Sequence, residues 1–366
     1  MRYDVIVIGA GMGGLTCGTL LAKEGLRVLI CEQSSKPGGY CVNFRRNGFT
    51  FAPAVHYFNE FGPNSQMQEA FQTLGLPPEI EFCPQNPQRR IITPYFHLTL
   101  STDMDRFERD LIQLFPKERL SIHAYIEELK RLVKNIDGLS IKSLDLISLK
   151  EKSQLLYKFI KRPQLLRYRG KTGQEVLDSF FKDPLLKYLL TFGVRKGSSI
   201  FSCASPIMWA IKGNFYYIKD KGVEALPKLF LRYYKAYGGE ISFNTLVKKI
   251  VIEEGKARAV QIEGGEEIQA RYVISNVDSY STFQYLIGNH LLPDRFVRGK
   301  GSDRDDMLAY WGKHRVLYAI HTDRHPLLFN VKFLYAFFLP WVFTNCGVVV
   351  DERSIKAHLC QIEIYT

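Results

Sequence analysis

The sequence lacks any ordered cysteine pattern. No C-x-x-C pair and no zinc-like spacing with histidine occurs among its seven cysteines: Cys17, Cys31, Cys41, Cys83, Cys203, Cys346 and Cys360. His314, His321 and His325 are also loosely spaced, so we predict no bound metal. An odd, scattered set of thiols is typical of a reducing compartment, which favours a cytoplasmic protein.

Acidic residues are few relative to basic ones. The chain has 49 Lys and Arg against 37 Asp and Glu, a formal net charge of +12. Such a charge favours an anionic partner, either membrane lipid or nucleic acid. No nucleic-acid-binding module is recognisable, so we expect no nucleic-acid partner. A signal peptide is not predicted either, because the first apolar segment lacks a basic n-region and contains Asp4.

The composition is neither disordered nor collagen-like, and 366 residues are enough for about two domains. The clearest pattern within them is residues 3–32. Asp4–Ile8 is a nearly continuous apolar run, which predicts a parallel strand buried on both faces. A helix follows, with Cys17, Leu20 and Leu21 as its apolar stripe and Gly25 as its C-cap. Leu26–Cys31 predicts the second strand.

Three glycines between this strand and helix have the spacing G-x-G-x-x-G. Gly9 permits the tight turn, Gly11 lets backbone amides approach a pyrophosphate, and Gly14 allows close packing of helix on strand. The helix N-terminus is positive and attracts phosphate without a basic side chain. Glu32 ends the second strand, where a carboxylate binds a ribose diol and repels a 2'-phosphate. The pattern therefore predicts a dinucleotide, FAD or NAD rather than NADP.

A second glycine segment and a hairpin follow the acid directly. Pro37, Gly38 and Gly39 form a turn whose paired glycines bring backbone close to a bulky group. Val42–Arg46 and Phe49–Phe51 flank Asn47-Gly48, a strong signal for a two-residue β-hairpin.

The order VIVIGAGMGGL, VLICEQSSKPGG and NGFTFAPAVHY resembles the FAD-dependent phytoene desaturase, carotenoid isomerase and retinol saturase family. In amine-oxidase-like relatives an arginine often follows the glycine pair, and here Tyr40 replaces it, which favours the isomerase and saturase branch. The resemblance implies an α/β fold with a Rossmann-like FAD-binding domain of the glutathione-reductase type and an inserted α+β substrate domain. It also implies FAD binding by Gly9, Gly11, Gly14, Glu32, Gly38, Gly39 and the backbone near Val247.

The rest of the resemblance sets the domain boundaries. Residues 214–290 resemble the family's second block, whose strand ending at Ser275-Asn276 returns to the flavin domain. We therefore predict that residues 1–85 and 214–290 form the FAD domain with parts of the substrate sheet, and that 86–213 form a mainly helical insert. Residues 291–366 remain an unassigned tail without the family's C-terminal glycine-rich element. The tail is consistent with a truncated or frame-altered product, part of a split enzyme, or a divergent ending.

Two parts of the insert have distinct patterns. Residues 121–136 place one apolar face at helical spacing, which predicts core, and Thr172 with Glu175 predicts a capping box. Residues 150–171 interleave eight basic residues with large apolar ones, as in a membrane-interface segment, and an ordinary solvated helix face explains them equally well.

The tail contains one long uncharged run, Phe333–Val350. It is interrupted by Pro340 and Gly347, which favours a buried or interfacial segment over a membrane span.

The resemblance implies FAD-dependent oxidoreduction or isomerisation at C-C or C=C bonds of a long apolar polyene, a carotenoid or retinoid. Because a flavin performs the redox chemistry itself, few catalytic side chains are needed. His56 and Tyr57 are the candidate catalytic pair, since this point lies near the flavin in the resembled saturases, and a structural role for His56 is the alternative. Two other functions remain open: a flavin amine oxidase, and a non-catalytic nucleotide-binding remnant or split-enzyme subunit. The oligomeric state is not predicted.

Overall fold

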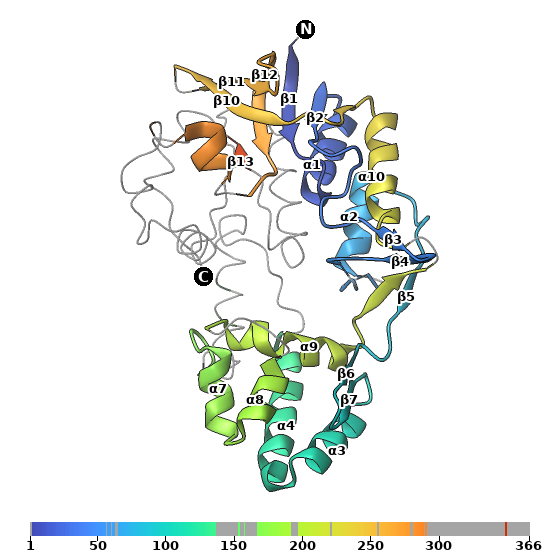
Figure 1. Cartoon of the computed structure of the whole chain (residues 1–366), viewed down its shortest axis with the longest axis vertical. Coiled ribbons are helices and arrows are strands. Elements are labelled where there is room, and N and C mark those ends of the chain that lie inside the picture. The colour runs from blue at the N-terminus through green and yellow to red at the C-terminus, as the bar shows by residue number, and fades with distance from the viewer. Residues whose placement is uncertain are drawn as a thin grey trace. The chain divides into compact units, whose positions relative to one another are not determined.

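The computed structural model divides the chain into two compact units (Figure 1). Unit 1 comprises residues 1–56, 64–81 and 218–366, and unit 2 comprises residues 57–63 and 82–217. The structure describes residues 2–55, 57–59, 61–62, 65–136, 153, 157, 167–191, 197–219, 222–254, 256–278, 281–288, 290, 348 and 349. Most of 150–171, His56, the three loosely spaced histidines and nearly all of the tail therefore lie outside the described residues.

Unit 1 contains a seven-stranded mixed sheet in the order β10-β11-β12-β1-β2-β9, with β13 paired to β12. The strands are β1 Tyr3–Ile8, β2 Val28–Cys31, β9 Glu240–Ser242, β10 Val247–Glu253, β11 Lys256–Ile262, β12 Glu267–Ser275 and β13 Val348–Val349. β1 is parallel to β2 and β12, and β2 is parallel to β9. β10, β11 and β12 are successively antiparallel. This is the predicted α/β arrangement with a parallel nucleotide-binding core.

The register aligns the carboxyl ends of the parallel strands. Ile8 pairs with both Cys31 and Ser275, and Cys31 pairs with Ser242. Each of these residues is the last of its strand. The residues that follow the strands therefore meet along one edge of the sheet, where open α/β sheets bind their ligands.

Helix α1, Met12–Lys23, is buried more widely than the sequence predicts. The predicted stripe of Cys17, Leu20 and Leu21 is too narrow, because Gly14–Thr16 and Gly18–Ala22 are all buried. The reason is a second covering helix, α10, Ala225–Ala236. A Cβ on Gly18 would lie 2.8 Å from Cδ1 of Ile30 in β2 and 3.3 Å from the ring of Tyr234 in α10. Helix α2, Gln66–Leu74, completes the helices of this unit's N-terminal part.

Two shorter elements of unit 1 flank this core. β3, Phe44–Arg46, and β4, Phe49–Phe51, pair antiparallel, and positive φ angles at Asn47 and Gly48 (50° and 80°) form their turn. This confirms the predicted hairpin. The π-helical turn η3, Thr282–Gly288, follows β12.

Unit 2 is mainly helical. It contains β5 Phe82–Pro84, β6 Arg89–Ile92, β7 His97–Leu100, α3 Met104–Leu114, η1 Pro116–Glu118, α4 Arg119–Ile136, α7 Gly173–Phe180, α8 Pro184–Thr191, α9 Ile200–Lys212 and the first two residues of β8 Tyr216–Ile218. β5 pairs with β8, and β6 with β7. The Thr172 capping box is confirmed: Thr172 Oγ1 accepts from Glu175 N (3.2 Å), and Glu175 Oε2 accepts from Thr172 N (2.7 Å).

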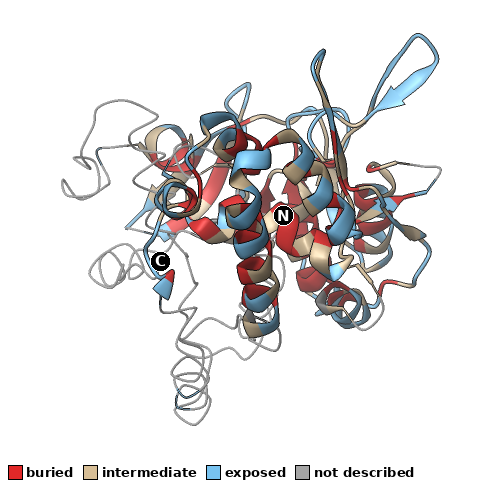
Figure 2. Ribbon diagram, turned by 90° about the horizontal axis from the view of Figure 1, so that it is seen from below, coloured by how far each residue is buried: buried red, intermediate tan, exposed pale blue. Residues whose placement is uncertain are grey.

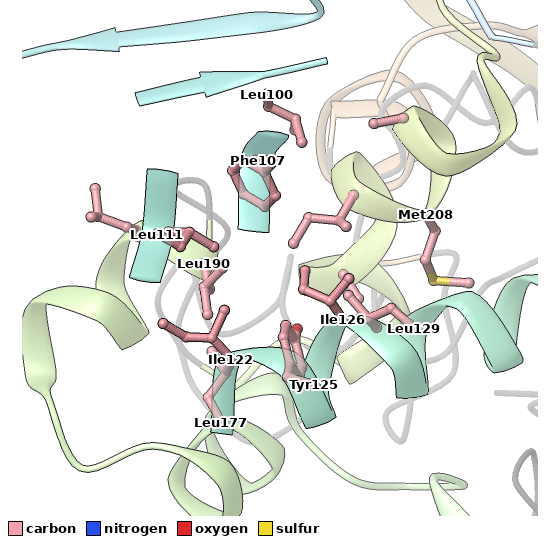
Figure 3. Packing of buried hydrophobic residues seen from close by; sticks show 14 of the residues in the cluster. Leu100, Phe107, Leu111, Ile122, Tyr125, Ile126, Leu129, Leu177, Leu190 and Met208 are labelled. Atoms are coloured by element: carbon pink, nitrogen blue, oxygen red, sulfur yellow. The ribbon is translucent and has the colours of Figure 1, made fainter. Parts of the chain in front are cut away.

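The core of unit 2 forms around α4. Ile122, Tyr125, Ile126, Leu129, Leu132 and Val133 of the predicted apolar face are all buried, which confirms that prediction. Figure 3 shows residues of this face directed toward Phe107 of α3 and Met208 of α9. Figure 2 shows several helices with buried residues on one face and exposed residues on the other. Their apolar periodicity therefore reflects packing.

Candidate functional site

The turn after β1 starts the candidate site. Gly9 has a φ of +97°, a conformation that strongly favours glycine, and its N-H donates to Cys31 O across 2.8 Å. Gly11 is the N-cap of α1, with no side-chain capping bond and no acidic residue in the first turn. The first N-H groups of a helix have no intrahelical acceptor. The positive end of α1 is therefore available to an anion at the carboxyl edge of the sheet.

Glu32 lies at the same edge, immediately after β2. It is buried, and its carboxylate accepts backbone N-H groups on both oxygens: Ala10 N to Oε2 at 2.6 Å and Ser34 N to Oε1 at 2.8 Å. Its backbone is also fixed, since Glu32 N donates to Ser242 O and Thr245 N donates to Glu32 O. A carboxylate offers about four lone-pair positions, so acceptor capacity remains for two hydroxyl groups. This arrangement fits a ribose diol.

The second glycine segment contacts the first. Gly38 forms a parallel bridge with Gly11, and Gly38 N donates to Ala10 O across 2.8 Å. A Cβ on Gly39 would lie 3.3 Å from the Cα of Gly11. Gly38 and Gly39 both have positive φ, 126° and 57°. The structure thus brings the two glycine segments and Glu32 together around the start of α1, although more than 20 residues separate the first glycine segment from the second in sequence.

Val247 approaches this group through the core of unit 1. It begins β10, is buried, and belongs to the same apolar cluster as Ile8 and Cys31 at the ends of β1 and β2. The candidate catalytic pair is not brought to the glycines by any described contact. His56 lies outside the described residues, and Tyr57 belongs to unit 2, where its ring packs edge-on against Phe215 at 5.0 Å.

Asn276 is a site residue whose role the sequence pattern did not predict. It follows β12, and its N-H donates to Ile8 O across 2.8 Å. Its side chain covers the glycine turn: a Cβ on Gly11 would lie 3.1 Å from Asn276 Nδ2, and one on Gly13 would lie 2.5 Å from Oδ1. Gly13 falls outside the G-x-G-x-x-G positions, so its small size is explained by a residue 263 positions later in the chain.

Glu224 is a second residue that sequence reasoning missed. It is the N-cap of α10 and accepts Lys36 Nζ and the backbone N-H of Asn43, each at 2.8 Å, and Lys228 Nζ at 2.9 Å. The Lys36 hydrogen bond, with the Asn43 N-H and Lys228, lowers the pKa of Glu224 to about 2. Because Lys36 and Asn43 flank Gly38 and Gly39, Glu224 anchors the segment that lies on Gly11.

We predict that this anchor makes stability depend on acid pH. The folded pKa of Glu224 lies below its unfolded value, so its contribution is complete above about pH 5 and is lost as the pH falls toward 2. Glu224→Gln should lower the urea midpoint most at neutral pH, and the difference from the unmodified chain should shrink at pH 3. Glu266→Gln, at an exposed turn, is the matched control. A Glu224→Gln difference that stays constant with pH would contradict the assignment.

The thiols at the site are not reactive. Burial raises the pKa of Cys31 and Cys41 to about 12, so neither supplies a thiolate near neutral pH. In the part of the chain that the structure describes, no group of three or more His, Cys, Asp or Glu could hold a metal ion. Nor is any helix there both long and apolar enough to cross a membrane. The site therefore offers glycine backbone, a helix N-terminus and one buried carboxylate.

These features define a Rossmann-like nucleotide-binding protein, and a family model agrees. Residues 7–74 match the NAD(P)-binding Rossmann-like domain. The solved structure of an oxidoreductase from Methanosarcina mazei superposes with a TM-score of 0.54 and 19% identity, over 87% of this chain and 66% of that one. At that identity the match shows the fold, and it confirms the predicted α/β class.

Two curated relatives match most of the chain. Prolycopene isomerase of Daucus carota is 29% identical over 312 residues, covering 80% of this chain and 49% of the relative. All-trans-retinol 13,14-reductase of Rattus norvegicus is 27% identical over 318 residues, covering 80% and 50%. The chain is a homologue of both, in agreement with the carotenoid isomerase and retinol saturase family that its motifs resemble. It spans about half the length of these relatives.

Proposed function

We propose that unit 1 binds FAD at the edge formed by β1, β2 and β12. Gly9, Gly11 and the N-terminus of α1 would hold the pyrophosphate, and Gly14 would keep that helix against the strand. Glu32 would bind the adenosine ribose through its two remaining acceptor positions. Gly38 and Gly39 would cover the pyrophosphate, and the backbone at Val247 would face the adenine. The support is geometric: the two glycine segments and the buried carboxylate converge on one helix N-terminus.

We further propose that the chain is an FAD-dependent oxidoreductase acting on C-C or C=C bonds of a long apolar polyene, a carotenoid or retinoid. One observation carries this proposal. The relatives matched over about 80% of the chain are named for prolycopene isomerisation and retinol reduction, two reactions of conjugated polyenes. When bound, the flavin supplies hydride transfer at N5.

The proposed roles of the remaining parts follow from their chemistry. Unit 2 would form most of the substrate side, in line with a helical insert at 86–213 between the FAD segments 1–85 and 214–290. Tyr57, half-buried beside Phe215, would line an apolar substrate path with a single hydroxyl, and His56 would be the adjacent proton donor or acceptor. Residues 150–171 would rest on the membrane that dissolves the polyene.

The test begins with the absorption spectrum of the purified chain. We expect flavin bands, with FAD released by heat in nearly one-to-one amount. Anaerobic addition of prolycopene or all-trans-retinol to the chain with oxidised or reduced FAD should then change the flavin spectrum and the polyene composition on chromatography. FAD binding with no response to any polyene would contradict the substrate class.

Two other outcomes distinguish the alternatives. Hydrogen peroxide produced with amines, and not with polyenes, would indicate an amine oxidase. A colourless chain that takes up no added FAD would indicate a nucleotide-binding remnant or a subunit that needs a partner, as expected if the half of the relatives that this chain does not match completes the site.

A further inference from the structure

The β3–β4 hairpin carries a cluster of exposed phenylalanines. Phe44 pairs with Phe51, and Arg46 pairs with Phe49. Because side chains alternate along a strand, Phe44, Phe49 and Phe51 share one face with Arg46, and Arg45 lies on the other. The Phe44 and Phe51 rings stack with centroids 5.1 Å apart, and Phe49 lies 6.4 Å from Phe51. We call Phe44, Phe49 and Phe51 the aromatic face.

This face is open to solvent despite the ring contacts. Phe44, Phe49 and Phe51 are 47%, 69% and 45% exposed. Every large exposed phenylalanine in the described part of the chain lies on this hairpin. An isolated two-stranded hairpin is at best marginally stable in water, and a concentrated exposed apolar patch marks an interaction site. Figure 1 shows the two strands side by side, and they form a sheet of their own.

Charge indicates what covers the aromatic face. Both Arg45 and Arg46 are exposed, and neither forms an ion pair within the described residues. The sequence contains no Asp or Glu between Glu32 and Glu60. The hairpin therefore combines exposed phenylalanines with two arginines as its charged residues, on a chain of net charge +12. An anionic lipid surface matches both properties, because rings enter the headgroup boundary while guanidinium groups bind lipid phosphate.

We propose that the β3–β4 hairpin is a membrane-contact element that binds anionic lipid through its aromatic face and its two arginines. This hairpin is a different segment of the sequence from residues 150–171, and its binding to lipid requires neither a flavin nor a polyene. Lipid binding can therefore be tested independently of the proposed reaction. A second copy of this chain, or another protein, on the aromatic face is the competing outcome.

The first experiment places a reporter on the aromatic face. Phe49→Trp is mixed with vesicles of equal parts phosphatidylcholine and phosphatidylglycerol, with and without brominated acyl chains that quench tryptophan. The emission of the unmodified chain is subtracted. Tyr95→Trp is the control, because Tyr95 lies between β6 and β7 of unit 2 and is 92% exposed. We expect a blue shift and quenching for Phe49→Trp and neither for Tyr95→Trp. Equal responses, or none, would overturn the proposal.

The second experiment separates rings from charge by vesicle co-sedimentation. Phe44→Ser/Phe49→Ser/Phe51→Ser and Arg45→Gln/Arg46→Gln should each weaken binding about tenfold or more, because the first removes the rings that enter the headgroup boundary and the second removes the charges that bind lipid phosphate. Ile92→Ser/Tyr95→Ser, at another exposed hairpin, should bind like the unmodified chain. Urea midpoints verify folding. Unchanged binding by both hairpin variants, or a dimer in sedimentation that the serine variant dissociates, would overturn the proposal.

Discussion

Gly14→Ala is expected to lower the free energy of unfolding by about 3 kcal/mol or more, the upper range for overpacking a closely packed position. The added Cβ would collide with the carbonyl oxygen of Gly9, and it would lie 3.3 Å from Cγ1 of Val7 in β1. The Gly9 carbonyl is backbone at a turn with φ +97°, so it cannot rotate away as a side chain would. Relief requires α1 to move from the sheet, and chemical denaturation followed by circular dichroism measures the loss.

Gly18→Ala is the matched control for this prediction. It makes the same substitution in the same helix, four residues later, and its Cβ would meet the Cδ1 tip of Ile30 at 2.8 Å. A flexible side-chain end can shift, and alanine favours a helix interior over glycine by about 1 kcal/mol. We therefore expect only a small change. Equal losses for Gly14→Ala and Gly18→Ala would show that general crowding of α1, and not the Gly9 carbonyl, limits this position.

Local patterns in the sequence predict much of the fold. The strand, turn, helix and strand of residues 3–32 depend on contacts between neighbouring elements, and the structure has β1, α1 and β2 there. Asn47 and Gly48 supply the positive φ angles that the hairpin needs, so two residues determine that turn. The apolar spacing of α4 likewise predicts its buried face, because the helical period decides which residues share a side.

Contacts between distant segments could not be predicted in this way. The Asn43 N-H to Glu224 bond joins residues 181 positions apart, and no local spacing indicates it. The wide burial of α1 depends on Tyr234 of α10, whose hydroxyl lies within hydrogen-bond distance of Val28 O (2.7 Å) and Glu240 O (2.6 Å). A prediction from periodicity treats each helix alone. It therefore predicts one buried stripe on α1, whereas β2 and α10 together bury more of its surface. The fit of Asn276 over Gly13 is a similar case.

If unit 1 binds FAD as proposed, Glu32→Gln is expected to weaken that binding between tenfold and a hundredfold. Both carboxylate oxygens of Glu32 accept backbone N-H groups, from Ala10 and Ser34. An amide keeps one acceptor and turns an N-H donor toward another donor, and hydrogen bonds to a charged group contribute about 1.5–3 kcal/mol each. Loss of one such interaction with the ribose corresponds to that range, since about 1.4 kcal/mol is tenfold. Quenching of FAD fluorescence on titration measures the dissociation constant.

A structural and an electrostatic role of Glu32 make different predictions about a 2'-phosphate. If Glu32 only braces the turn after β1, Glu32→Gln should weaken the binding of ADP-ribose and the binding of ADP-ribose 2'-phosphate by the same factor. If the charge of Glu32 faces the ribose, the substitution should weaken the binding of ADP-ribose. It should also raise the affinity for ADP-ribose 2'-phosphate relative to that for ADP-ribose, because the repulsion between the carboxylate and the 2'-phosphate is removed. Glu240→Gln is the control: it makes the same exchange at the amino end of β9, where the carboxylate accepts the Tyr3 hydroxyl at 2.8 Å. A ratio unchanged from the unmodified chain would remove Glu32 from the nucleotide site and leave it a structural brace.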